Sequence, residues 1–457
     1  MSARVGADRV WLVLPDLLST RVFVDTGIVA RLREALGERL VPIPLIDREA
    51  AARWGDAITT GIDPAELAPW EASLPEKVKR RSDEWLDRRF GFFPLAVRLN
   101  YRHGFHLERM EPGHRNRFLD SARVGPLPRT VWAENAMARW YFSPRRYVPS
   151  ALAARMRAEC RSLIVSNIQI SGAGRYLTAA RRVRLPVVGY VASWDHAVGK
   201  GVMSPHLDRY IVQNEIMRGD LERYHGITGE RVVTTGWPQS DVFHRRRDRA
   251  ELDAVLERYG LDATRPVVLV TGNSPTNAPY EGRFVERLVR WWRDEAAERM
   301  TLLFRPHPRD SEWTERYAAA IAAPGVGVQP ASYTDMDDLA TLLQHAAVVV
   351  TNAGTILLDA LVNDRPAICV VYDEGAPPGA RAAELNVLGA HYVELMESGA
   401  FPLAASFDDV VREIDAALTR PDERRAARAS VAKQVLGVID GQAVTRVVDA
   451  ILETADP

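Results

Sequence analysis

Cysteine is scarce in this sequence, with only Cys160 and Cys369 among 457 residues. The two lie far apart and neither belongs to a Cys-x-x-Cys or Cys/His pair, which excludes a disulfide scaffold and a zinc module. No run approaches the roughly 20 apolar residues that a membrane-spanning helix needs. The early stretch from Trp11 to Asp16 is too short and too interrupted for a signal peptide. These absences predict a protein of the reducing cytoplasm.

An excess of charge of either sign is also missing, because 59 Lys and Arg oppose 60 Asp and Glu. This balance argues against a nucleic-acid partner. The segment 76–146 departs from it, with 16 Lys and Arg against 8 Asp and Glu, 11 aromatic residues and three histidines. Such a basic, aromatic insertion can meet an anionic acceptor or lipid headgroups. A solvated helical surface over an aromatic core explains the same composition.

Apolar, β-branched runs bounded by turn residues predict strands in two groups, with helices between them. The predicted strands are Val10–Leu14, Ser162–Ser166, Val187–Val191, Tyr210–Gln213 and Arg231–Thr235 in the first group, and Pro266–Thr271, Thr301–Arg305, Val348–Thr351 and Ala367–Val371 in the second. This alternation predicts an α/β fold with two parallel sheets. We place the N-terminal domain at residues 1–244, including the insertion, and the C-terminal domain at 245–457, including the terminal helices.

The second domain carries polar residues where its predicted strands end, which is where open α/β sheets bind ligands. The first such loop offers Gly272, Asn273 and Ser274. Arg305 and His307 follow another strand in Arg305-Pro-His-Pro308, where the prolines lower the entropic cost of holding a cation and an imidazole against a phosphate. A simple turn and a rigid loop with solvated charges are the structural alternatives.

The loop after the strand at Val348–Thr351 is a third candidate for donor binding. Thr351 and Asn352 end the strand, Gly354 permits a tight turn, and Thr355 opens a helix whose free N–H groups can hold an anion. Asp359, one turn further on, can accept hydrogen bonds from a ribose. The alternative is that Thr355 only caps the helix and Asp359 pairs locally.

In the first domain, a predicted strand leads into a loop with a carboxylate, an imidazole and an amine: Asp195, His196 and Lys200. We take Asp195 as the candidate catalytic base, with His196 as the alternative base, and Lys200 as an acceptor contact. Judged in isolation, Asp195 and His196 would more often cap a helix or lie on the surface. Asp241 and His103 are further candidates for acceptor binding. The histidines of the basic insertion lack metal-ligand spacing, so we expect no metal site.

Taken in order, these stretches resemble glycosyltransferases of the GT-B fold and, within them, the CDP-glycerol glycerophosphotransferase-like family. The similarity runs from about Ser162 to the C-terminus. The matching stretches are Trp194-Asp-His-Ala-Val-Gly-Lys200 for the family's Trp-His-Gly-Thr-Pro-Leu-Lys loop, Gly236-Trp-Pro-Gln-Ser-Asp241 for Gly-x-Pro-Arg-x-Asp, Arg305-Pro-His-Pro308 for the His-Pro motif, and Asp440-Gly-Gln-Ala-Val-Thr-Arg-Val447 for the closing Asp-Gly-x-x-x-x-Arg-Val. The sequence differs from the family at Asp195, in the place of a histidine base, and at Thr351-Asn-Ala-Gly-Thr355, in the place of Thr-Asp-Tyr-Ser-Ser. It also lacks an arginine after the first loop of the second domain.

The resemblance implies two Rossmann-like domains that face each other across a cleft, with a C-terminal helix that returns to the N-terminal domain. It implies a transferase that moves a glycosyl or phosphopolyol group from a nucleotide-activated donor to a hydroxyl acceptor, in the synthesis of a surface glycan, wall polymer or glycolipid. CDP- or CMP-linked donors are favoured, with UDP-linked donors as the alternative. No cofactor and no metal are expected, and the insertion suggests peripheral association with the inner face of the cell membrane. The competing functions are a nucleotide-sugar 2-epimerase and a non-catalytic protein that binds glycans or membrane surfaces.

Overall fold

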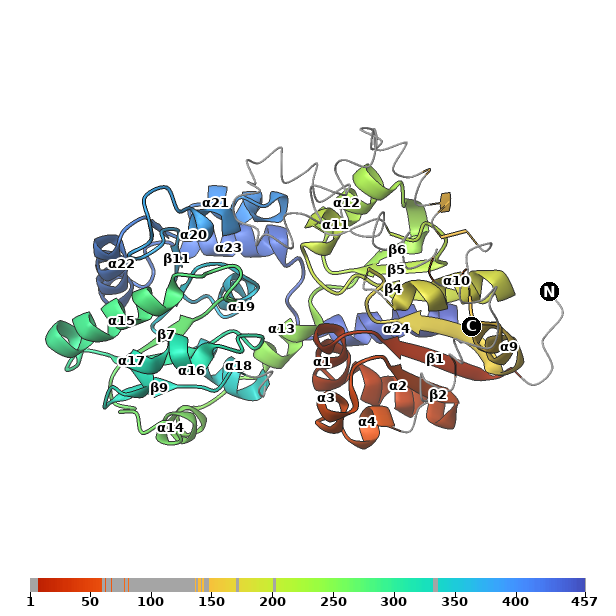
Figure 1. Ribbon diagram of the computed structural model, residues 1–457, viewed down its shortest axis with the longest axis horizontal. Helices are drawn as coiled ribbons and strands as arrows, with labels where there is room; N and C mark the ends of the chain where they lie inside the picture. Colours follow the sequence, from red (N-terminus) through yellow and green to blue (C-terminus); the bar gives the residue numbers. More distant parts are fainter. Residues whose placement is uncertain are drawn as a thin grey trace. The chain divides into compact units, whose positions relative to one another are not determined.

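The computed structural model describes residues 7–59, 148–169, 172–199, 203–331 and 336–456, with a few isolated residues between 60 and 147. The chain divides into two compact units (Figure 1). Unit 1 holds the described residues up to Asp241 and those from Asp440 onward, and unit 2 holds Val242–Ile439. His103, Lys200 and nearly all of the basic insertion lie outside the described residues.

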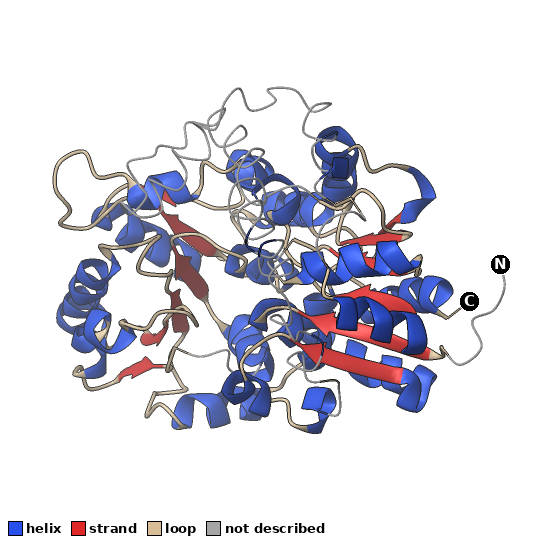
Figure 2. Ribbon diagram, turned by 45° about the vertical axis from the view of Figure 1, so that its right-hand side comes forward, coloured by secondary structure: helices blue, strands red, loops and turns tan. Residues whose placement is uncertain are grey.

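Unit 1 is built on a six-stranded parallel sheet with the order β2-β1-β3-β4-β5-β6. Its strands are β1 (Arg9–Leu14), β2 (Leu40–Pro44), β3 (Cys160–Val165), β4 (Val187–Tyr190), β5 (Arg209–Val212) and β6 (Val232–Thr234). Its helices are α1 (Leu17–Asp25), α2 (Ile28–Leu36), η1 (Gly37–Arg39), α3 (Arg48–Ala52), α4 (Asp56–Thr59), α9 (Ser150–Glu159), α10 (Ala173–Val183), α11 (His196–Gly199), α12 (Glu215–His225), η4 (Gly229–Arg231) and α24 (Ala443–Ala455), while α13 (Pro238–His244) crosses into unit 2. Helices flank the sheet on both sides (Figure 2), which explains why its central strands are mostly apolar.

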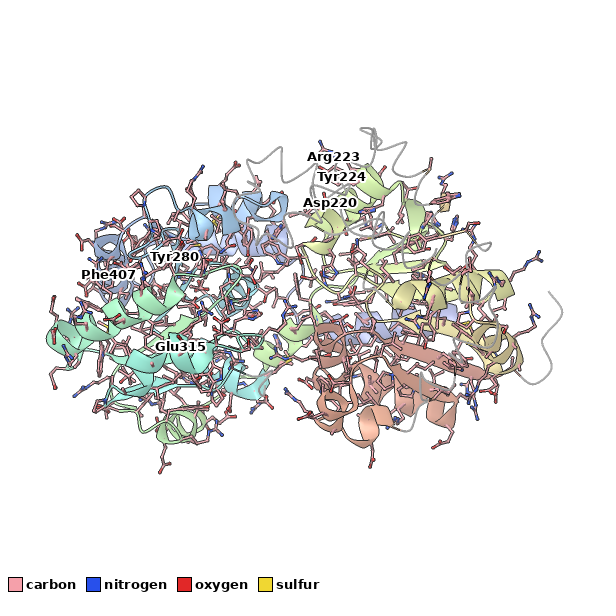
Figure 3. The ribbon with its side chains drawn as sticks, in the orientation of Figure 1. Asp220, Arg223, Tyr224, Tyr280, Glu315 and Phe407 are labelled. Carbon is pink, nitrogen blue, oxygen red and sulfur yellow. The ribbon has the colours of Figure 1, made fainter. Side chains whose placement is uncertain are left out.

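Unit 2 repeats this architecture with the strand order β12-β11-β10-β7-β8-β9. Its strands are β7 (Val267–Thr271), β8 (Thr301–Arg305), β9 (Val326–Val328), β10 (Val348–Thr351), β11 (Ala367–Val370) and β12 (Leu403–Ala404). Its helices are α14 (Arg249–Glu257), α15 (Glu281–Trp291), the π-helical turn η5 (Trp292–Ala296), α16 (Trp313–Arg316), α17 (Ala318–Ile321), α18 (Met336–His345), α19 (Ile356–Val362), α20 (Ala382–Asn386), η6 (Ala390–Tyr392), α21 (Val393–Glu397), α22 (Phe407–Thr419) and α23 (Arg425–Val435). On one face of the sheet, Phe284 of α15 and Phe407 of α22 meet edge to face with ring centroids 6.4 Å apart (Figure 3 labels Phe407).

All nine predicted strands are present, with ends that agree or differ by at most two residues. Three strands were missed, and all three contain weak or contrary signals. β2 includes Pro42 and Pro44, β9 is a three-residue strand with a central glycine, and β12 has two residues. All three lie at a sheet edge, where proline and short length are tolerated because one side of the strand needs no partner.

The final helix α24 belongs to unit 1, although the chain before it belongs to unit 2 (Figure 1). Its apolar face, with Val444, Val447 and Ile451, joins the hydrophobic core on one face of the first sheet. The return of the C-terminal helix is therefore as expected from the fold class. The grouping of residues 440–457 with the C-terminal domain differs from the structure, because the periodicity of an amphipathic helix does not reveal which sheet it covers.

Two distant stretches hold α24 in place. The carboxylate oxygens of Asp241 accept hydrogen bonds from the backbone N–H groups of Ala443 (3.1 Å) and Val444 (2.8 Å) at the start of the helix. Arg446 donates from Nε to the Thr235 carbonyl (2.7 Å) and pairs with Asp440. We call this set of contacts the α24 clasp.

Strand order reverses direction between β1 and β3 in unit 1 and between β7 and β10 in unit 2. At such a switch point the following loops diverge to opposite faces of the sheet and leave a crevice at the carboxyl ends of the strands. The loops after β7 and β10 include the stretches around Asn273 and Thr355, so the fold brings these predicted donor-binding loops to one edge. Among the described residues, no helix is both long and apolar enough to cross a membrane.

Candidate active site

A cluster of asparagines fastens the loops at the switch point of unit 2. Asn352 accepts hydrogen bonds at Oδ1 from the side chains of Asn273 (3.3 Å) and Asn386, and it donates its own amide hydrogens to the carbonyls of Val370 (2.7 Å) and Ala383 (3.0 Å). These contacts join the loops that follow β7, β10 and β11. The side chain of Asn352 therefore holds these loops together, and the donor contact that the sequence predicted for it stays a prediction.

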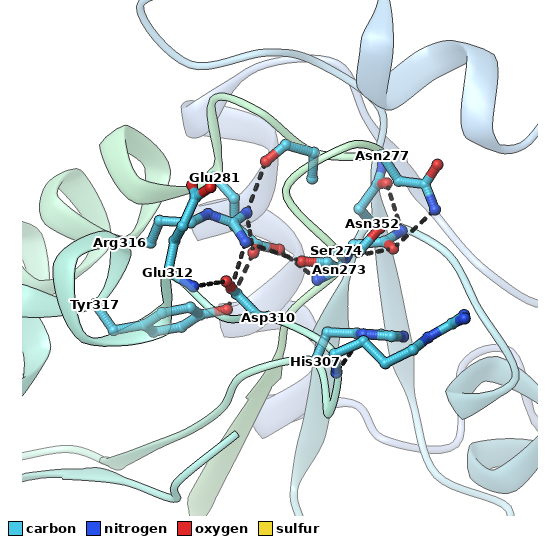
Figure 4. A network of polar contacts seen from close by, with 12 residues as sticks. Asn273, Ser274, Asn277, Glu281, His307, Asp310, Glu312, Arg316, Tyr317 and Asn352 are labelled. Atoms are coloured by element: carbon cyan, nitrogen blue, oxygen red, sulfur yellow. Dashed lines mark hydrogen bonds and ion pairs between the residues drawn. The ribbon is translucent and has the colours of Figure 1, made fainter. Parts of the chain in front are cut away.

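A buried ionic network holds the loop after β7 (Figure 4). Arg316 donates to the carboxylates of Glu281 (2.7 Å) and Asp310, and also to the backbone carbonyls of Asn273 (3.1 Å) and Ala278 (2.7 Å). Asn273 returns a backbone N–H bond to Glu281 (2.8 Å). Because one guanidinium pairs with two carboxylates and binds two carbonyls, it fixes both ends of the loop.

The same network explains the glycine at the start of this loop. Tyr317 donates its hydroxyl to Glu281 (3.1 Å), and a Cβ atom on Gly272 would collide with that hydroxyl. Burial raises the pKa of Glu281 to about 7, while Arg316 and the hydrogen bonds from Asn273 and Tyr317 favour its ionised form. Gly272 thus serves close packing, and its predicted contact with the donor stays a prediction, as does that of Ser274, whose N–H binds Asn273 Oδ1 (2.8 Å).

His307 lies on the turn that follows β8 (Figure 4). The backbone N–H of Arg309 donates to His307 Nδ1 (3.1 Å). Burial, followed by the charges of Arg309 and Arg316, lowers the pKa of His307 to about 4. The imidazole is therefore neutral at pH 7, and because Nδ1 accepts a hydrogen bond, the proton resides on Nε2. This arrangement gives His307 one N–H group with which to bind an anion.

Arg305 lies at the end of β8 and makes a buried contact within unit 2. Its side chain is buried, with 8% of the residue exposed, and Nη1 donates to the side-chain oxygen of Gln329 (2.7 Å) just beyond β9. This contact ties the ends of two neighbouring strands together. A contact between Arg305 and a donor phosphate stays a prediction.

The turn after β10 shows which of its groups a ligand can reach. Gly354 has φ of 118°, and its N–H donates to the Tyr392 hydroxyl (2.7 Å) instead of lying open to an anion. Thr351 is buried and donates to the carbonyl of Ala353 (3.3 Å). Thr355 is exposed, and its side chain does not cap α19. Asp359 lies half-buried on the same helix. The accessible part of this turn is therefore Thr355 and the helix start behind it.

A pocket lies beside these loops, at the carboxyl ends of β7, β10 and β11. Its empty volume, including space open to solvent, is about 460 Å³. The lining includes Thr271, Thr351, Tyr280 of the loop before α15 (Figure 3) and Tyr372. Thr271 is 7% exposed, and its buried Oγ1 has no hydrogen-bond partner among the residues that the structure describes. Because an unsatisfied buried hydroxyl is costly, a polar ligand group in this pocket would be stabilised by it.

In unit 1, the two candidate bases in the loop after β4 differ in their exposure to solvent. Asp195 is half-buried and accepts a hydrogen bond at Oδ1 from the Ser193 hydroxyl (2.5 Å). His196 begins α11 and is only 4% exposed. His225 fastens this helix by a hydrogen bond from Nε2 to the Ala197 carbonyl (2.8 Å). Asp195 is therefore the more accessible of the two candidate bases, and His196 is buried.

The structure also shows a group of linked polar residues that the sequence analysis did not single out. At the switch point of unit 1, Asp16 caps α1 through the N–H of Ser19 (3.0 Å), Asn167 donates to Asp16 (2.9 Å), and Ser166 donates to Ser19 (2.9 Å). A strand followed at once by Asp-x-x-Ser is the sequence signal that marks this helix start. In unit 2, nothing in the sequence pattern pairs Arg316 with Glu281.

The remaining predicted residues divide into two groups. Asp241 uses both carboxylate oxygens in the α24 clasp, and its predicted acceptor contact stays a prediction. Lys200 and His103 lie outside the described residues. Within the described part of the chain, no group of three or more His, Cys, Asp and Glu side chains is arranged to hold a metal ion. Metal-independent chemistry stays a prediction.

Comparison with known families identifies the kind of protein. Residues 201–453, more than half of the chain, match the sequence model of the family described as CDP-Glycerol:Poly(glycerophosphate) glycerophosphotransferase. The chain belongs to this family. The match confirms the resemblance carried by the motifs and makes the protein a member of a transferase family. A comparison with curated proteins found no match.

Solved structures confirm the fold. The MnaA–UDP co-structure from S. aureus has a TM-score of 0.53 at 12% identity, covering 97% of this chain and 96% of that chain. UDP-GlcNAc 2-epimerase from Neisseria meningitidis, bound to UDP-GlcNAc, has a TM-score of 0.52 at 9% identity, covering 97% and 100%. The wall teichoic acid polymerase TagF has a TM-score of 0.47 at 15% identity, covering 67% and 75%. At such identities the likeness to the first two structures shows the fold alone, which is the GT-B fold of two Rossmann-like domains.

Proposed function

We propose that the protein transfers a phosphopolyol group from a CDP-linked donor to a hydroxyl group of a polyol-phosphate or lipid-linked acceptor, in the synthesis of a cell-envelope polymer. The family match carries this proposal, because the family's description names CDP-glycerol as donor and poly(glycerophosphate) as acceptor. The unit 2 pocket and His307 support it, since they offer a polar cavity and a fixed N–H donor at the edge where α/β sheets bind ligands.

The proposed reaction is a displacement at phosphorus. The acceptor oxygen attacks the phosphorus that bears the polyol, the anhydride P–O bond breaks, and CMP leaves with the electron pair of that bond. Asp195 takes the proton of the acceptor hydroxyl as the new P–O bond forms, a role that contributes about 10²–10⁴ in rate. The hydrogen bond from Ser193 holds one oxygen of Asp195, which orients the carboxylate for this transfer.

On the donor side, negative charge grows on the departing CMP phosphate. The Nε2–H of His307 and the N-terminal end of α19 at Thr355 are the groups that we assign to this charge, because both are fixed before the reaction begins. A neutral imidazole suffices, since a hydrogen bond and not a transferred proton is required. Asp359 is assigned to the ribose and Thr271 to a polar atom of the nucleotide.

The first experiment is thermal unfolding of the protein with CMP, CDP, UDP, GDP and dTDP in turn. A nucleotide at 100 times its Kd adds about 2.7 kcal/mol to the free energy of unfolding. Stabilisation by cytidine nucleotides alone is expected. Selective stabilisation by another nucleotide would show that the donor carries that nucleotide and not CDP. In that case the protein should not release CMP from CDP-glycerol in the presence of acceptor.

The base assignment is tested by Asp195→Asn with Glu222→Gln as its control, since Glu222 is an exposed carboxylate on α12 of the same unit. Asp195→Asn should lower kcat at least 100-fold while the Kd for CDP stays unchanged, because the amide cannot take a proton. The control should keep both values. A variant that loses affinity for CDP instead would show that Asp195 binds the donor.

The epimerase alternative is tested without an acceptor. Incubation with UDP-N-acetylglucosamine alone should leave the sugar unchanged, because a transferase has nothing to act on. Formation of the 2-epimer would show that the protein is an epimerase and would contradict the proposed transferase function.

A further inference from the structure

A second pocket lies at the opposite end of the strands that carry the donor-site loops. Pro266, Ala347 and Pro366 line it, and each immediately precedes a strand: β7, β10 and β11. The four residues of β10 rise about 3.3 Å each, so about 13 Å of strand separates this pocket from the carboxyl-end pocket. Its empty volume, including space open to solvent, is about 1030 Å³. We call it the amino-end pocket.

Cations outnumber carboxylates in the lining of the amino-end pocket. The charged lining residues are Arg299, Arg365, Arg425 and Arg428 against Asp364 and Asp422. Asp364 accepts from Nε of both Arg428 (2.8 Å) and Arg425 (2.7 Å), and Asp422 pairs with Arg425 (3.1 Å). Arg299 is paired with a carboxylate outside the lining, that of Asp415. Once these pairs are formed, the excess positive charge lies on Arg365.

Arg365 lacks the acidic partner that the other arginines have. Within the described part of the chain, its guanidinium makes one hydrogen bond, from Nε to the Asn363 carbonyl (3.1 Å), and no carboxylate lies within ion-pair distance. Burial lowers the pKa of Arg365, and the nearby charges of Arg428 and Arg425 lower it further, against the opposing effect of Asp364. An anion in the pocket would relieve this repulsion and use the terminal N–H groups of the guanidinium.

We propose that the amino-end pocket binds a phosphate group of a larger molecule, with Arg365 as its principal contact and the exposed Arg425 at the rim. A guanidinium presents two parallel N–H groups that match two phosphate oxygens. Thr419 adds a hydroxyl to the lining, and Ala347 and Leu418 add apolar surface for the attached group. The site lies in unit 2 at the edge of the sheet opposite the donor-site loops, so a ligand there does not occupy the donor pocket.

Calorimetric titration of pyrophosphate into the full-length protein tests the proposal, at constant ionic strength and with and without saturating CMP. Arg365→Gln should weaken binding about 10- to 100-fold, as expected for the loss of a charge-assisted pair of hydrogen bonds. The control is Arg290→Gln, because Arg290 is an exposed arginine of α15 that pairs with its helix neighbour Glu286 and lines neither pocket. The control should stay within twofold of the unchanged protein, and CMP should not compete.

Equal affinity in Arg365→Gln and in the unchanged protein would overturn the proposal, as would pyrophosphate binding that CMP abolishes. Arg425→Gln, at the more exposed rim, should weaken binding by a few-fold. This second variant keeps the proposal testable if Arg365→Gln does not fold. Failure of CMP to bind would count against the proposed function alone, because the comparison of variants needs no nucleotide. Titrations with glycerol 3-phosphate and with a glycerol phosphodiester then distinguish a free metabolite from a polymer. Binding of neither compound would also overturn the proposal.

Discussion

Replacement of His307 tests the donor-site geometry most directly. The Arg309 N–H occupies Nδ1, and the lowered pKa keeps the ring neutral, so the group that can donate to a ligand is the N–H at Nε2. Removal of one preorganised donor to a developing oxyanion costs about 2.7–4 kcal/mol, or 10²–10³ in kcat. We therefore expect His307→Ala to release CMP from CDP-glycerol at least 100-fold more slowly, with a folded protein.

Two further variants separate the two ring nitrogens. In His307→Gln the side-chain amide nitrogen can lie near the position of Nε2 and donate, whereas in His307→Asn the side-chain oxygen can lie near Nδ1 and accept from Arg309. The glutamine variant should keep more activity, and the asparagine variant should keep more thermal stability. Initial rates of CMP release and the Tm of each variant decide. Activity of His307→Ala within threefold of the unchanged protein, or greater activity of the asparagine variant, would refute the reasoning.

The pH dependence follows from the same lowered pKa. Because folding lowers the pKa of His307 from 6.5 to about 4, the folded state binds fewer protons than the unfolded chain between these values. The contribution to stability is complete above pH 6.5 and is lost as the pH falls toward 4. The dependence of kcat/KM on pH between pH 5 and 8 should therefore have the same shape in the unchanged protein and in His307→Gln. A fall in kcat/KM at acid pH that the substitution abolishes would contradict the neutral ring.

Two stability predictions concern the contacts that hold the loops and the final helix. Arg316→Leu should lower the free energy of unfolding by about 3–5 kcal/mol, because it leaves Glu281 and Asp310 buried without their cation, and denaturant unfolding measures it. A loss below 1 kcal/mol would show that these carboxylates are protonated in the folded state. Asp241→Ala should cost about 1–2 kcal/mol through loss of the cap on α24, whereas an unchanged stability with altered acceptor affinity would restore the acceptor role.

The sequence located the central strands of both sheets because they are buried on two faces and read as unbroken apolar runs. It did not locate β2, where Pro42 and Pro44 contradict a strand unless that strand lies at an edge. Edge position is a property of the assembled sheet, so a local sequence pattern cannot predict it. For the same reason, the periodicity of α24 predicted a helix and its apolar face but not the sheet that it covers.

In the candidate site, the sequence identified the loops better than the roles of their side chains. Motif order placed Asn352 and Gly354 at a strand end, but only the structure shows that their polar groups bind Ala383 and Tyr392 within the domain. The partners come from segments more than 30 residues away, and such pairing has no local signature. Arg316, which no motif contains, does more to shape the loop after β7 than any residue that the motifs suggested.

The α24 clasp shows why membership in a motif does not by itself indicate contact with substrate. The stretches ending at Asp241 and beginning at Asp440 match two separate family signatures, yet in the structure they meet, with both oxygens of Asp241 on the N-terminus of α24 and Arg446 on the Thr235 carbonyl. Chemical availability is the stricter criterion. It favours His307, whose Nδ1 accepts a hydrogen bond and so leaves the proton on Nε2, and Thr271, whose buried hydroxyl has no partner among the described residues. Substitutions of these two should change ligand binding or turnover, whereas substitution of Asp241 should change stability.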